Sequence, residues 1–191
     1  MARESNPRGA GDQLRAELVA AASALLLDPQ SVALPSLRAV ARACSVSPAA
    51  VYLHFDSAQA LTTAVLDAQL DDLEKAIRSQ LPEGVPPRAR LAALGRAYAG
   101  WGLAHPGAYQ LVFESADRLD LPEHEHDRWS LIDEAARLVA AETTVTPDQA
   151  TATALRLWTM LHGLVSLRIH KPLLPWPPVD DEIDETIARL V

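Results

Sequence analysis

The chain has 191 residues, of which 49% are hydrophobic, 22% charged and 5% aromatic. That length is enough to bury a substantial core, as one large domain or two small ones. The net charge of −8, from 17 Lys and Arg against 25 Asp and Glu, excludes a protein that coats nucleic acid through bulk positive charge. The single cysteine, Cys44, excludes an internal disulfide and fits a reducing compartment.

The longest mostly apolar run, residues 18–27, has about half of the roughly 20 residues that a membrane-spanning helix needs. Acidic residues before this run and the sequence Asp28-Pro29-Gln30 after it argue against a signal peptide. We therefore expect a cytoplasmic protein with no membrane partner. The charge is uneven: residues 1–57 are neutral and the rest of the chain holds all of the −8, which permits local contact between the N-terminal part and DNA.

The first 57 residues predict an arm followed by three helices. Residues 1–11 lack an apolar period and are expected to be a disordered arm. A helix capped by Asp12 is expected to end near Asp28-Pro29. Ser36 caps a short second helix, and Ser47-Pro48 opens a third that runs to about His54. Two short helices joined this tightly predict a helix-turn-helix over residues 12–57.

The rest of the chain also has helical periods, interrupted by prolines. A connecting helix is expected over 58–80, capped by Asp56 or Ser57, and a Pro-rich break follows at 81–87. Residues 81–191 then predict a C-terminal domain of helices. These begin after Pro87, around Tyr109, before Ile132, at the capping box Thr146-Pro147-Asp148-Gln149, and at Asp180. With no strand-like alternation, the fold class is all-α.

The most specific pattern lies between residues 34 and 61. Its elements are Ser36-x-Arg38-x-Val40-Ala41, Val46-Ser47, Val51-Tyr52-x-His54-Phe55 and Leu61. Together they resemble the DNA-binding domain of the TetR family of bacterial transcriptional regulators, over roughly residues 12–66. The alternative is a helix-turn-helix that serves packing alone.

The resemblance and the helical spacing together assign roles in this region. Val46, Val51 and Phe55 are expected to pack the third helix on the first two. Arg38 is expected to read guanine, with Arg3 and Arg8 either reaching DNA or remaining solvated. The predicted DNA-binding residues, including phosphate contacts from Ser36, Tyr52 and His54, are Ser36, Arg38, Ser47, Ala49, Ala50, Tyr52, Leu53 and His54.

The sequence departs from the family pattern at two positions. Ser45 stands where the turn usually has Gly, and Ala58 stands where a Lys commonly opens the next helix. Loss of that Lys removes a phosphate contact. We therefore expect weak nonspecific DNA binding with a shallow dependence on salt.

A second pattern lies in the C-terminal part, in Trp158-x3-His162-Gly163 and in Tyr98-x2-Trp101-x4-Pro106-x2-Tyr109-x3-Phe113. Both resemble the C-terminal domain of a TetR subgroup named for a Trp-His-Gly motif. Gly163 lets a neighbouring helix or a ligand approach. The side chains either fill the core or line a pocket for a mostly apolar effector. The candidate ligand-binding residues are Tyr98, Trp101, Tyr109, Phe113, Trp158 and His162.

The sequence gives little support for metal binding, redox sensing or catalysis. The acidic and His-containing segment 123–127 lacks the further ligands that a metal site would need, so we expect no metal and no cofactor. Cys44 suits packing better than redox sensing. No phosphate-binding loop, nucleophile elbow or catalytic triad is found, so no catalytic residue is assigned.

The sequence thus predicts a homodimeric transcriptional regulator, most simply a repressor that a small ligand releases from a palindromic operator. A central helix that is apolar on more than one face, over 147–170, is expected to be shared between core and partner. The residues assigned to the dimer interface are Leu157, Leu164, Ile183 and Ile187. A DNA-binding helical protein without a pocket remains an alternative, as does an all-α small-molecule-binding protein or enzyme.

Overall fold

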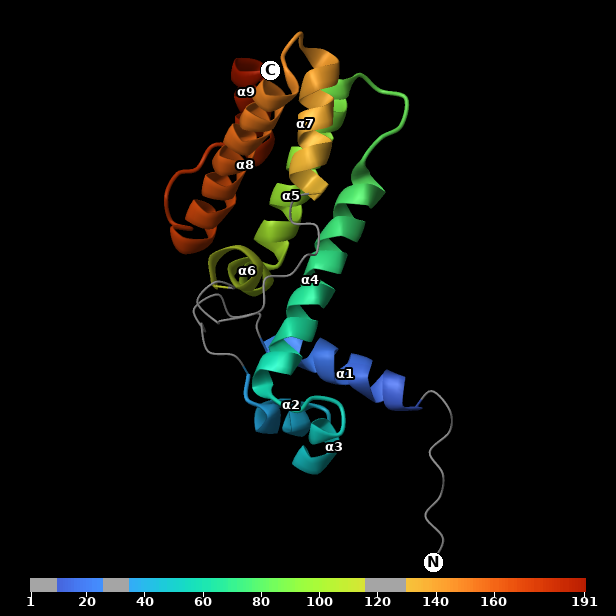
Figure 1. The fold of residues 1–191 in the computed structure, drawn as a ribbon. Helices are drawn as coiled ribbons and strands as arrows, with labels where there is room; N and C mark the ends of the chain where they lie inside the picture. The colour runs from blue at the N-terminus through green and yellow to red at the C-terminus, as the bar shows by residue number, and fades with distance from the viewer. Residues whose placement is uncertain (1–9, 26–34, 116–129) are drawn as a thin grey trace, which may run out of the picture.

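The computed structural model describes residues 10–25, 35–115 and 130–191, and every regular element in these ranges is a helix. The all-α class is therefore confirmed. Figure 1 shows a head of three helices at one end, a long helix rising from it, and a group of helices at the other end. The elements are α1 (Ala10–Leu25), α2 (Leu37–Ala43), α3 (Pro48–Tyr52), α4 (Ala58–Gln80), α5 (Pro87–Ala104), α6 (Pro106–Gln110), the π-helix η1 (Leu111–Ser115), α7 (Ser130–Glu142), α8 (Pro147–His170) and α9 (Val179–Leu190).

Helix starts follow the capping signals of the sequence. The hydroxyls of Ser36, Ser47 and Ser57 each accept a hydrogen bond from the backbone N–H three residues on. Thr146 and Gln149 form the predicted capping box of α8. Each cap satisfies a backbone donor that the helix itself leaves unpaired, so these starts are fixed by local chemistry.

α4 ends at Gln80 and α8 at His170, as expected, whereas some other boundaries differ from the expectation by one or a few residues. α1 begins at Ala10 and places Asp12 in the first turn, where a carboxylate still interacts favourably with the helix dipole. α3 ends at Tyr52, before His54. The expectations for residues 1–9, for the end of the first helix near Pro29 and for the segment 120–129 lie outside the described residues.

The head is built on a small apolar core that α4 completes. Leu18 of α1, Val40 of α2 and Val51 of α3 are fully buried, and Leu61 and Val65 of α4 close this core. The amide of Gln69 on α4 also donates to the hydroxyl of Ser23 on α1, at 3.0 Å. The first part of α4 therefore packs as part of the head, and the head and α4 form one structural unit.

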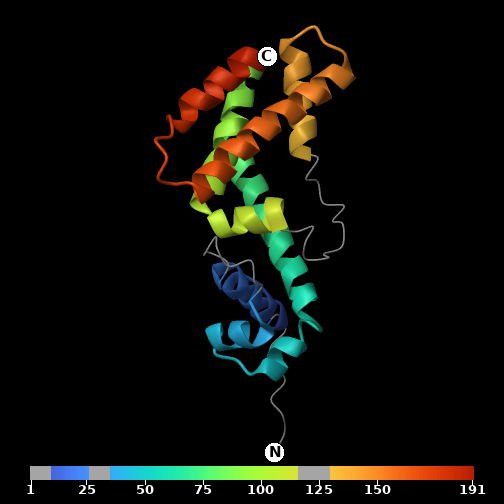
Figure 2. The ribbon, with the colours of Figure 1, turned by 90° about the vertical axis from the view of Figure 1, so that its left-hand side faces the viewer.

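The C-terminal helices pack around α5. Figure 2 shows α8 crossing in front of α5, with α9 on one side, α7 on the other and α6 below. α5 contacts α4, α6, α7, α8 and α9, which makes it the central helix of this part. The buried side chains of this core include Leu94, Tyr98, Trp101, Tyr109, Val139, Ala154, Val165, Ile183 and Ile187.

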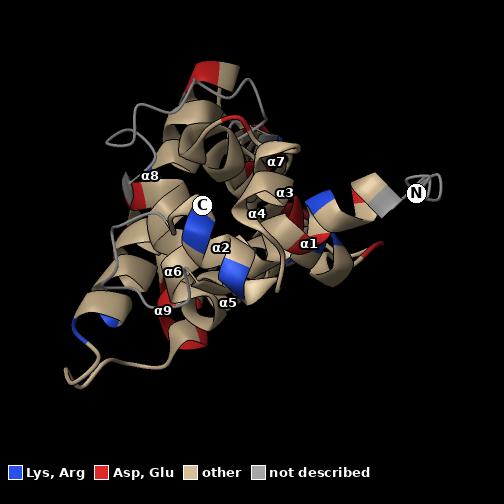
Figure 3. Cartoon of the chain, turned by 90° about the horizontal axis from the view of Figure 1, so that it is seen from below, with Lys and Arg blue, Asp and Glu red and all other residues tan. Residues whose placement is uncertain are grey.

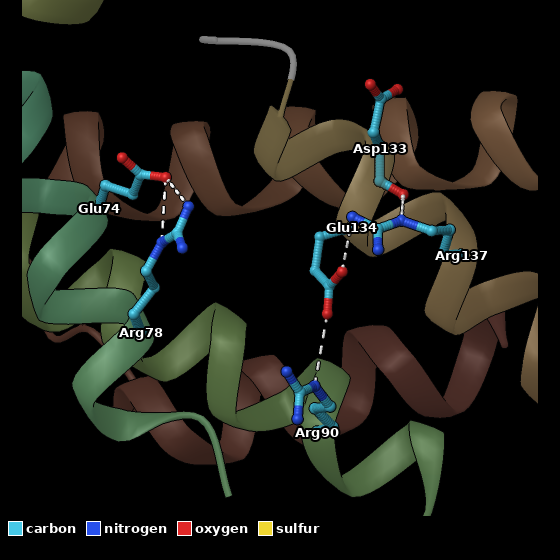
Figure 4. Close-up of polar contacts among 6 residues, drawn as sticks. All are labelled: Glu74, Arg78, Arg90, Asp133, Glu134 and Arg137. Atoms are coloured by element: carbon cyan, nitrogen blue, oxygen red, sulfur yellow. Dashed lines mark hydrogen bonds and ion pairs between the residues drawn. The ribbon is translucent and has the colours of Figure 1, made fainter. Parts of the chain in front are cut away.

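An ion pair holds α7 to α5, and a hydrogen bond holds the 81–86 connection to α5. Figure 4 shows the carboxylate of Glu134 on α7 between Arg90 of α5 and Arg137 of α7. The Glu134 oxygens lie 3.4 Å from Arg90 Nε and 2.8 Å from Arg137 Nη2. Arg90 Nη1 also donates to the carbonyl of Pro82, at 3.1 Å. Arg90 thereby fixes the turn through which the chain passes from α4 to α5.

The residues that the sequence assigned to a dimer interface lie mainly inside the chain. Leu157 is 4% exposed, Ile183 1% and Ile187 4%, whereas Leu164 is half-buried. Ile183 faces α5, because a Cβ built on Gly95 would lie 3.2 Å from its Cγ2 atom. The apolar face of amphipathic α9 therefore packs on the core of its own chain, and three of the four assigned side chains are buried there; their part in a dimer interface stays a prediction.

Within the described residues, no helix is both long enough and apolar enough to span a membrane. The longest helix, α8, has 24 residues but carries charged and polar side chains along one side.

Gly102 of α5 marks the tightest approach in the C-terminal core. A Cβ built there would lie 2.7 Å from both Tyr109 Cδ2 and Val165 Cγ1, closer than side chains can pack. The side chains of Tyr109 and α8 thus meet α5 directly at a residue without a side chain. Gly100 lies two residues earlier on the same helix. No described atom lies within 4 Å of a Cβ built there.

These two glycines give a matched test of the packing. Gly102→Ala is expected to destabilise the fold by about 1–3 kcal/mol, because overpacking outweighs the gain in helix propensity. Gly100→Ala is expected to stabilise it by up to about 1 kcal/mol, because only the propensity gain acts. Urea denaturation of both variants measures this difference. Equal effects of the two substitutions would contradict the close approach at Gly102.

Candidate nucleic-acid interface and aromatic core cluster

The third helix of the head is anchored on one side and exposed on the other. Val51 is fully buried and Phe55 is 2% exposed, whereas Leu53 is 84% exposed and Tyr52 is 58% exposed. The guanidinium of Arg15 on α1 lies over the Phe55 ring, 5.0 Å from its centroid. Burial thus fixes the orientation of α3, and its outer side presents an apolar and a phenolic side chain to the surroundings.

The predicted DNA-binding residues surround this exposed side. Arg38, Ala49 and the two capping serines are exposed, and Ala50 and His54 are half-buried. The Ser36 and Ser47 hydroxyls accept from the N–H groups of Ala39 and Ala50, at 3.2 Å each. Since each hydroxyl only accepts in its cap, its own proton remains a donor. Viewed from below, the ribbon of α2 and its surroundings is mostly uncharged, with blue segments on α2 (Figure 3).

The turn between α2 and α3 requires a left-handed backbone. Ser45 has φ of 55°, the only positive φ among the described non-glycine residues. Its N–H donates to the carbonyl of Arg42, and Val46 N–H donates to the carbonyl of Ala41. A left-handed residue just after a helix satisfies the last carbonyls, and glycine adopts it without strain. The departure from glycine at this position therefore carries a backbone cost.

Cys44 packs between the first two helices. Its Sγ atom lies 3.6 Å from the carbonyl oxygen of Glu17 and donates to it. Burial, with a smaller effect of the Glu17 carboxylate, raises the pKa of the Cys44 thiol. A thiol that stays protonated is a poor nucleophile, which supports the packing role.

Five of the six predicted ligand-binding side chains form one aromatic cluster. Phe113 of η1 lies 5.5 Å from Tyr98, 4.9 Å from Tyr109 and 6.2 Å from His162, between ring centroids. The rings of Trp158 and His162 are 5.8 Å apart on successive turns of α8. The cluster therefore joins α5, α6, η1 and α8.

A chain of hydrogen bonds runs through this cluster. The Tyr109 hydroxyl lies 2.9 Å from the Tyr98 hydroxyl and 2.7 Å from His162 Nδ1. Burial raises the pKa of Tyr98 to about 12 and raises that of Tyr109 further. Burial also lowers the pKa of His162, against a smaller opposing effect of Glu114. Both phenols are therefore protonated donors, and the imidazole is neutral near pH 7.

Trp101 does not belong to this cluster. Its indole N–H donates to Asp72 Oδ2 on α4, at 2.8 Å, and its ring lies against His105 at 5.3 Å. Trp101 and Tyr98 lie three residues apart on one helix, yet Trp101 contacts α4 whereas Tyr98 contacts α6 and α8. The sixth predicted residue thus joins the C-terminal part to the helix that carries the head.

The sequence analysis missed Glu114, which links η1 to α8. Its carboxylate accepts from the Ser166 hydroxyl at 2.6 Å and lies 2.9 Å from His170 Nε2. Only one-fifth of its side chain is exposed. A Glu beside a predicted aromatic residue gives no sequence signal of its own, because the partners lie more than 50 residues away.

No group of His, Cys, Asp and Glu suitable for a metal ion occurs among the residues that the structure describes. The segment 123–127, which the sequence analysis considered for a metal, lies outside them.

The fold and the head define a class of protein: an α-helical protein with a helix-turn-helix, whose second short helix has an exposed outer side. A family model described as the tetracyclin repressor-like C-terminal domain matches residues 91–191, more than half of the chain. The chain belongs to the TetR family of transcriptional regulators, which are DNA-binding proteins and not enzymes. Its place in the Trp-His-Gly subgroup stays a prediction.

Solved structures support the same fold. A TetR-like transcriptional regulator from Rhodococcus sp. RHA1 has 18% identity and a TM-score of 0.74, with 97% of each chain covered. BioQ bound to its double-stranded DNA operator has 22% identity and a TM-score of 0.65, covering 92% of this chain and 96% of that one. TetR-Q116A from Acinetobacter baumannii AYE, in complex with minocycline, has 20% identity and a TM-score of 0.64, covering 90% and 93%. A search of curated proteins found no match.

The lowered pKa of His162 predicts a pH dependence of stability. Below about pH 6.5, its ordinary value, the unfolded chain binds a proton at this residue more readily than the folded chain does. Stability is therefore lost as the pH falls from 7.5 to 5.5. His162→Gln, which retains a polar partner for Tyr109, is expected to lose less stability over this range in urea denaturation. An identical pH dependence in both proteins would contradict the burial of a neutral imidazole.

The left-handed turn predicts a stabilising substitution. Ser45→Gly is expected to raise the free energy of unfolding by about 0.5–1 kcal/mol, because relief of the backbone strain exceeds the extra entropy of glycine in the unfolded chain. Ser57→Gly, at an extended N-cap, serves as the control and is expected to be neutral or slightly destabilising. A destabilised Ser45→Gly variant would show that the turn does not need this conformation.

Proposed function

We propose that the protein is a homodimeric, cytoplasmic repressor that binds a palindromic DNA operator through α3 and is released by a small, mostly apolar ligand in the C-terminal domain. The observation that carries this proposal is the exposure of α3. Leu53 and Tyr52 extend outward from a helix whose other side is fully buried. A short helix that is anchored on one side and exposed on the other is the arrangement with which a recognition helix enters the major groove.

The predicted DNA-binding residues have different roles in this proposal. Arg38 reads a guanine with two hydrogen bonds. Ala49, Ala50 and Leu53 contact thymine methyl groups. Tyr52, His54 and the two capping serines donate to phosphates. Phosphate contacts fix the position of α3 on the duplex, and Arg38 and Leu53 supply the preference for sequence. Since the head has few basic residues, affinity depends on these directed contacts more than on net charge.

Recognition of a DNA site requires a second copy of the chain. α3 has five residues and spans only a few base pairs. Two heads related by a two-fold axis, about 34 Å apart, read two half-sites on one side of the duplex. The relative orientation of the two heads then determines whether both can bind at once.

The aromatic cluster is the proposed ligand site. Its rings supply apolar surface, and its polar atoms bond to one another through the Tyr109 hydroxyl. A ligand with one polar group near His162 replaces part of this hydrogen-bond chain and moves η1, which contacts α4. Such movement changes the spacing of the heads, and by linkage DNA then weakens ligand binding to the same extent.

The internal pairing of these polar atoms also favours a second candidate, a DNA-binding protein whose C-terminal core is solid. In that case no small molecule changes operator affinity, although the head works as described. Screening of aromatic and apolar compounds against a labelled protein–DNA complex separates the two candidates.

The DNA-binding role is tested with selected DNA. The full chain is used to select sites from a random duplex library, and binding to the selected site is measured by fluorescence anisotropy at two salt concentrations. Arg38→Ala is expected to weaken binding by about 1–3 kcal/mol and to relax the preference at one base pair, because a bidentate contact is lost. Arg137→Ala, which removes an exposed arginine of α7, is the matched control and is expected to bind as the wild type does.

Two results would overturn the proposal. One is a selection that returns no sequence preference over random DNA. The other is equal binding by the Arg38→Ala and Arg137→Ala variants when both remain folded.

A further inference from the structure

The hydrogen bonds of the aromatic cluster run in one direction. The hydroxyl of Tyr98 is hydrogen-bonded to the side chain of Trp158 and lies 2.9 Å from the hydroxyl of Tyr109. An indole N–H can only donate, so Tyr98 accepts from Trp158 and needs an acceptor for its own proton. Tyr98 is buried, and a buried hydroxyl proton without an acceptor is costly. Within the described residues, the acceptor for this proton is the Tyr109 oxygen.

This direction determines which nitrogen of His162 carries the proton. Since the Tyr109 oxygen accepts from Tyr98, the Tyr109 proton goes to a further acceptor. His162 Nδ1 lies 2.7 Å from the Tyr109 oxygen, a normal hydrogen-bond distance, whereas the carbonyl oxygen of His162 lies 3.4 Å away. Nδ1 therefore accepts and carries no proton. Burial lowers the pKa of His162, so the ring is neutral near pH 7 and its single proton is on Nε2.

The Nε2–H group of His162 is thus an oriented donor at the end of the hydrogen-bond chain. None of the described residues accepts a hydrogen bond from it. The hydrogen bond to Tyr109 holds the imidazole at Nδ1, and the Tyr109 ring stacks on it at 5.6 Å between centroids. A donor that is already held in place favours binding, because less conformational freedom is lost when a ligand binds to it.

The surroundings of this donor favour an acceptor without charge. The rings of Trp158 and Phe113 lie 5.8 Å and 6.2 Å from the imidazole, between centroids. An anion buried among such rings would lose its hydration at a high cost. The Glu114 carboxylate is also close enough for its charge to oppose the lowering of the His162 pKa. The same negative charge repels an anionic ligand, whereas a carbonyl oxygen accepts a hydrogen bond and brings no charge.

We propose that the ligand presents a neutral hydrogen-bond acceptor, such as the carbonyl oxygen of a ketone or an ester, to the Nε2–H group of His162. This inference rests on the proposed function, in which the aromatic cluster is the ligand site. It refines that proposal, because the acceptor extends the hydrogen-bond chain at its end instead of replacing part of it. The apolar body of the ligand lies along the rings of Trp158 and Phe113. Phe113 belongs to η1, which contacts α4, so the ligand acts on a segment next to the helix that carries the head.

The position of the proton is tested without any ligand. Nitrogen NMR of the full chain with labelled histidine distinguishes a protonated ring nitrogen from an unprotonated one, and the signals lost in His162→Gln are those of His162. Near pH 7 we expect a protonated Nε2 and an unprotonated Nδ1. Tyr109→Phe removes the donor to Nδ1 and is expected to give a mixture of the two neutral forms. A protonated Nδ1 in the wild type would overturn the proposal.

The acceptor is tested with three probes of similar shape. They are a naphthyl methyl ketone, the isopropenyl hydrocarbon of the same outline, and naphthoate. Their dissociation constants for the full chain are measured by titration calorimetry. The ketone is expected to bind the wild type at least tenfold more tightly than naphthoate, because the anion meets the charge of Glu114 among apolar rings.

Variants of His162 isolate the hydrogen bond. His162→Phe keeps a ring but removes the donor, and is expected to weaken ketone binding about fivefold while leaving the hydrocarbon within about twofold of the wild type. In His162→Gln the amide oxygen accepts from Tyr109 and the amide NH₂ donates, so ketone binding is expected to be retained. His105→Phe makes the same change at a half-buried histidine outside the cluster and is expected to bind all three probes as the wild type does.

Three results would overturn the proposal about the acceptor. The first is that none of the probes binds. The second is that naphthoate binds as tightly as the ketone or more tightly. The third is that His162→Phe weakens the ketone and the hydrocarbon to the same extent.

Binding to the selected DNA separates this inference from the proposed function. If no probe binds but the full chain still prefers the selected DNA, the inference is rejected and the DNA-binding role stands. If the ketone binds through His162 without changing the affinity for the selected DNA, the inference stands and release by a ligand is rejected.

Discussion

One turn of α4 connects the two halves of the molecule. Gln69 donates to Ser23 in the head, and one turn later Asp72 accepts from the indole of Trp101 in the C-terminal core. A hydrogen bond from a buried indole to a carboxylate is charge-assisted and directional, so it fixes how α5 lies against α4. The orientation of α3 therefore depends on a contact far from DNA. A change in α5, α6 or η1 reaches the head through this one turn of α4, which bonds to both halves.

This arrangement explains why the aromatic cluster lies where it does. Because Gly102 has no side chain, Tyr109 packs directly against α5. Its hydroxyl is hydrogen-bonded to both Tyr98 and His162. The π-helix η1 follows at once, and Glu114 ties it to α8. A π-helix is rare in proteins and often occurs at functional sites. The segment that touches both the cluster and α4 is thus the least regular one among the described helices.

The sequence predicted the features that local chemistry determines. Serine caps, the capping box of α8 and the prolines after α4 and α5 act over a few residues, and the structure has each helix start that they indicate. The exposed side of α3 was also predictable, because Val51 and Phe55 mark the buried side. The left-handed turn at Ser45 agrees with the glycine that the family has at this position.

The neighbours that side chains contact across the fold were not predictable from the sequence pattern. An apolar period shows that Ile183 and Ile187 face something apolar, but not whether that is α5 or a second molecule. Trp101 and Tyr98 share a stripe in the sequence, yet they diverge toward α4 and α8 because a helix stripe is wide enough to meet two neighbours. Glu114 gave no signal, since its partners are distant in the sequence. Gly163 was noticed as a place where a neighbouring helix or a ligand could approach, and the structure has no described atom within 4 Å of a Cβ built there.

The most direct test of the account is a hydroxyl-radical footprint of the full chain on DNA from immediately upstream of its gene. The account predicts two protected half-sites with related sequences, on one side of the duplex and about one helical turn apart, because two α3 helices enter successive major grooves. A single protected half-site, or protection that follows no sequence, would contradict a dimer that reads DNA through α3.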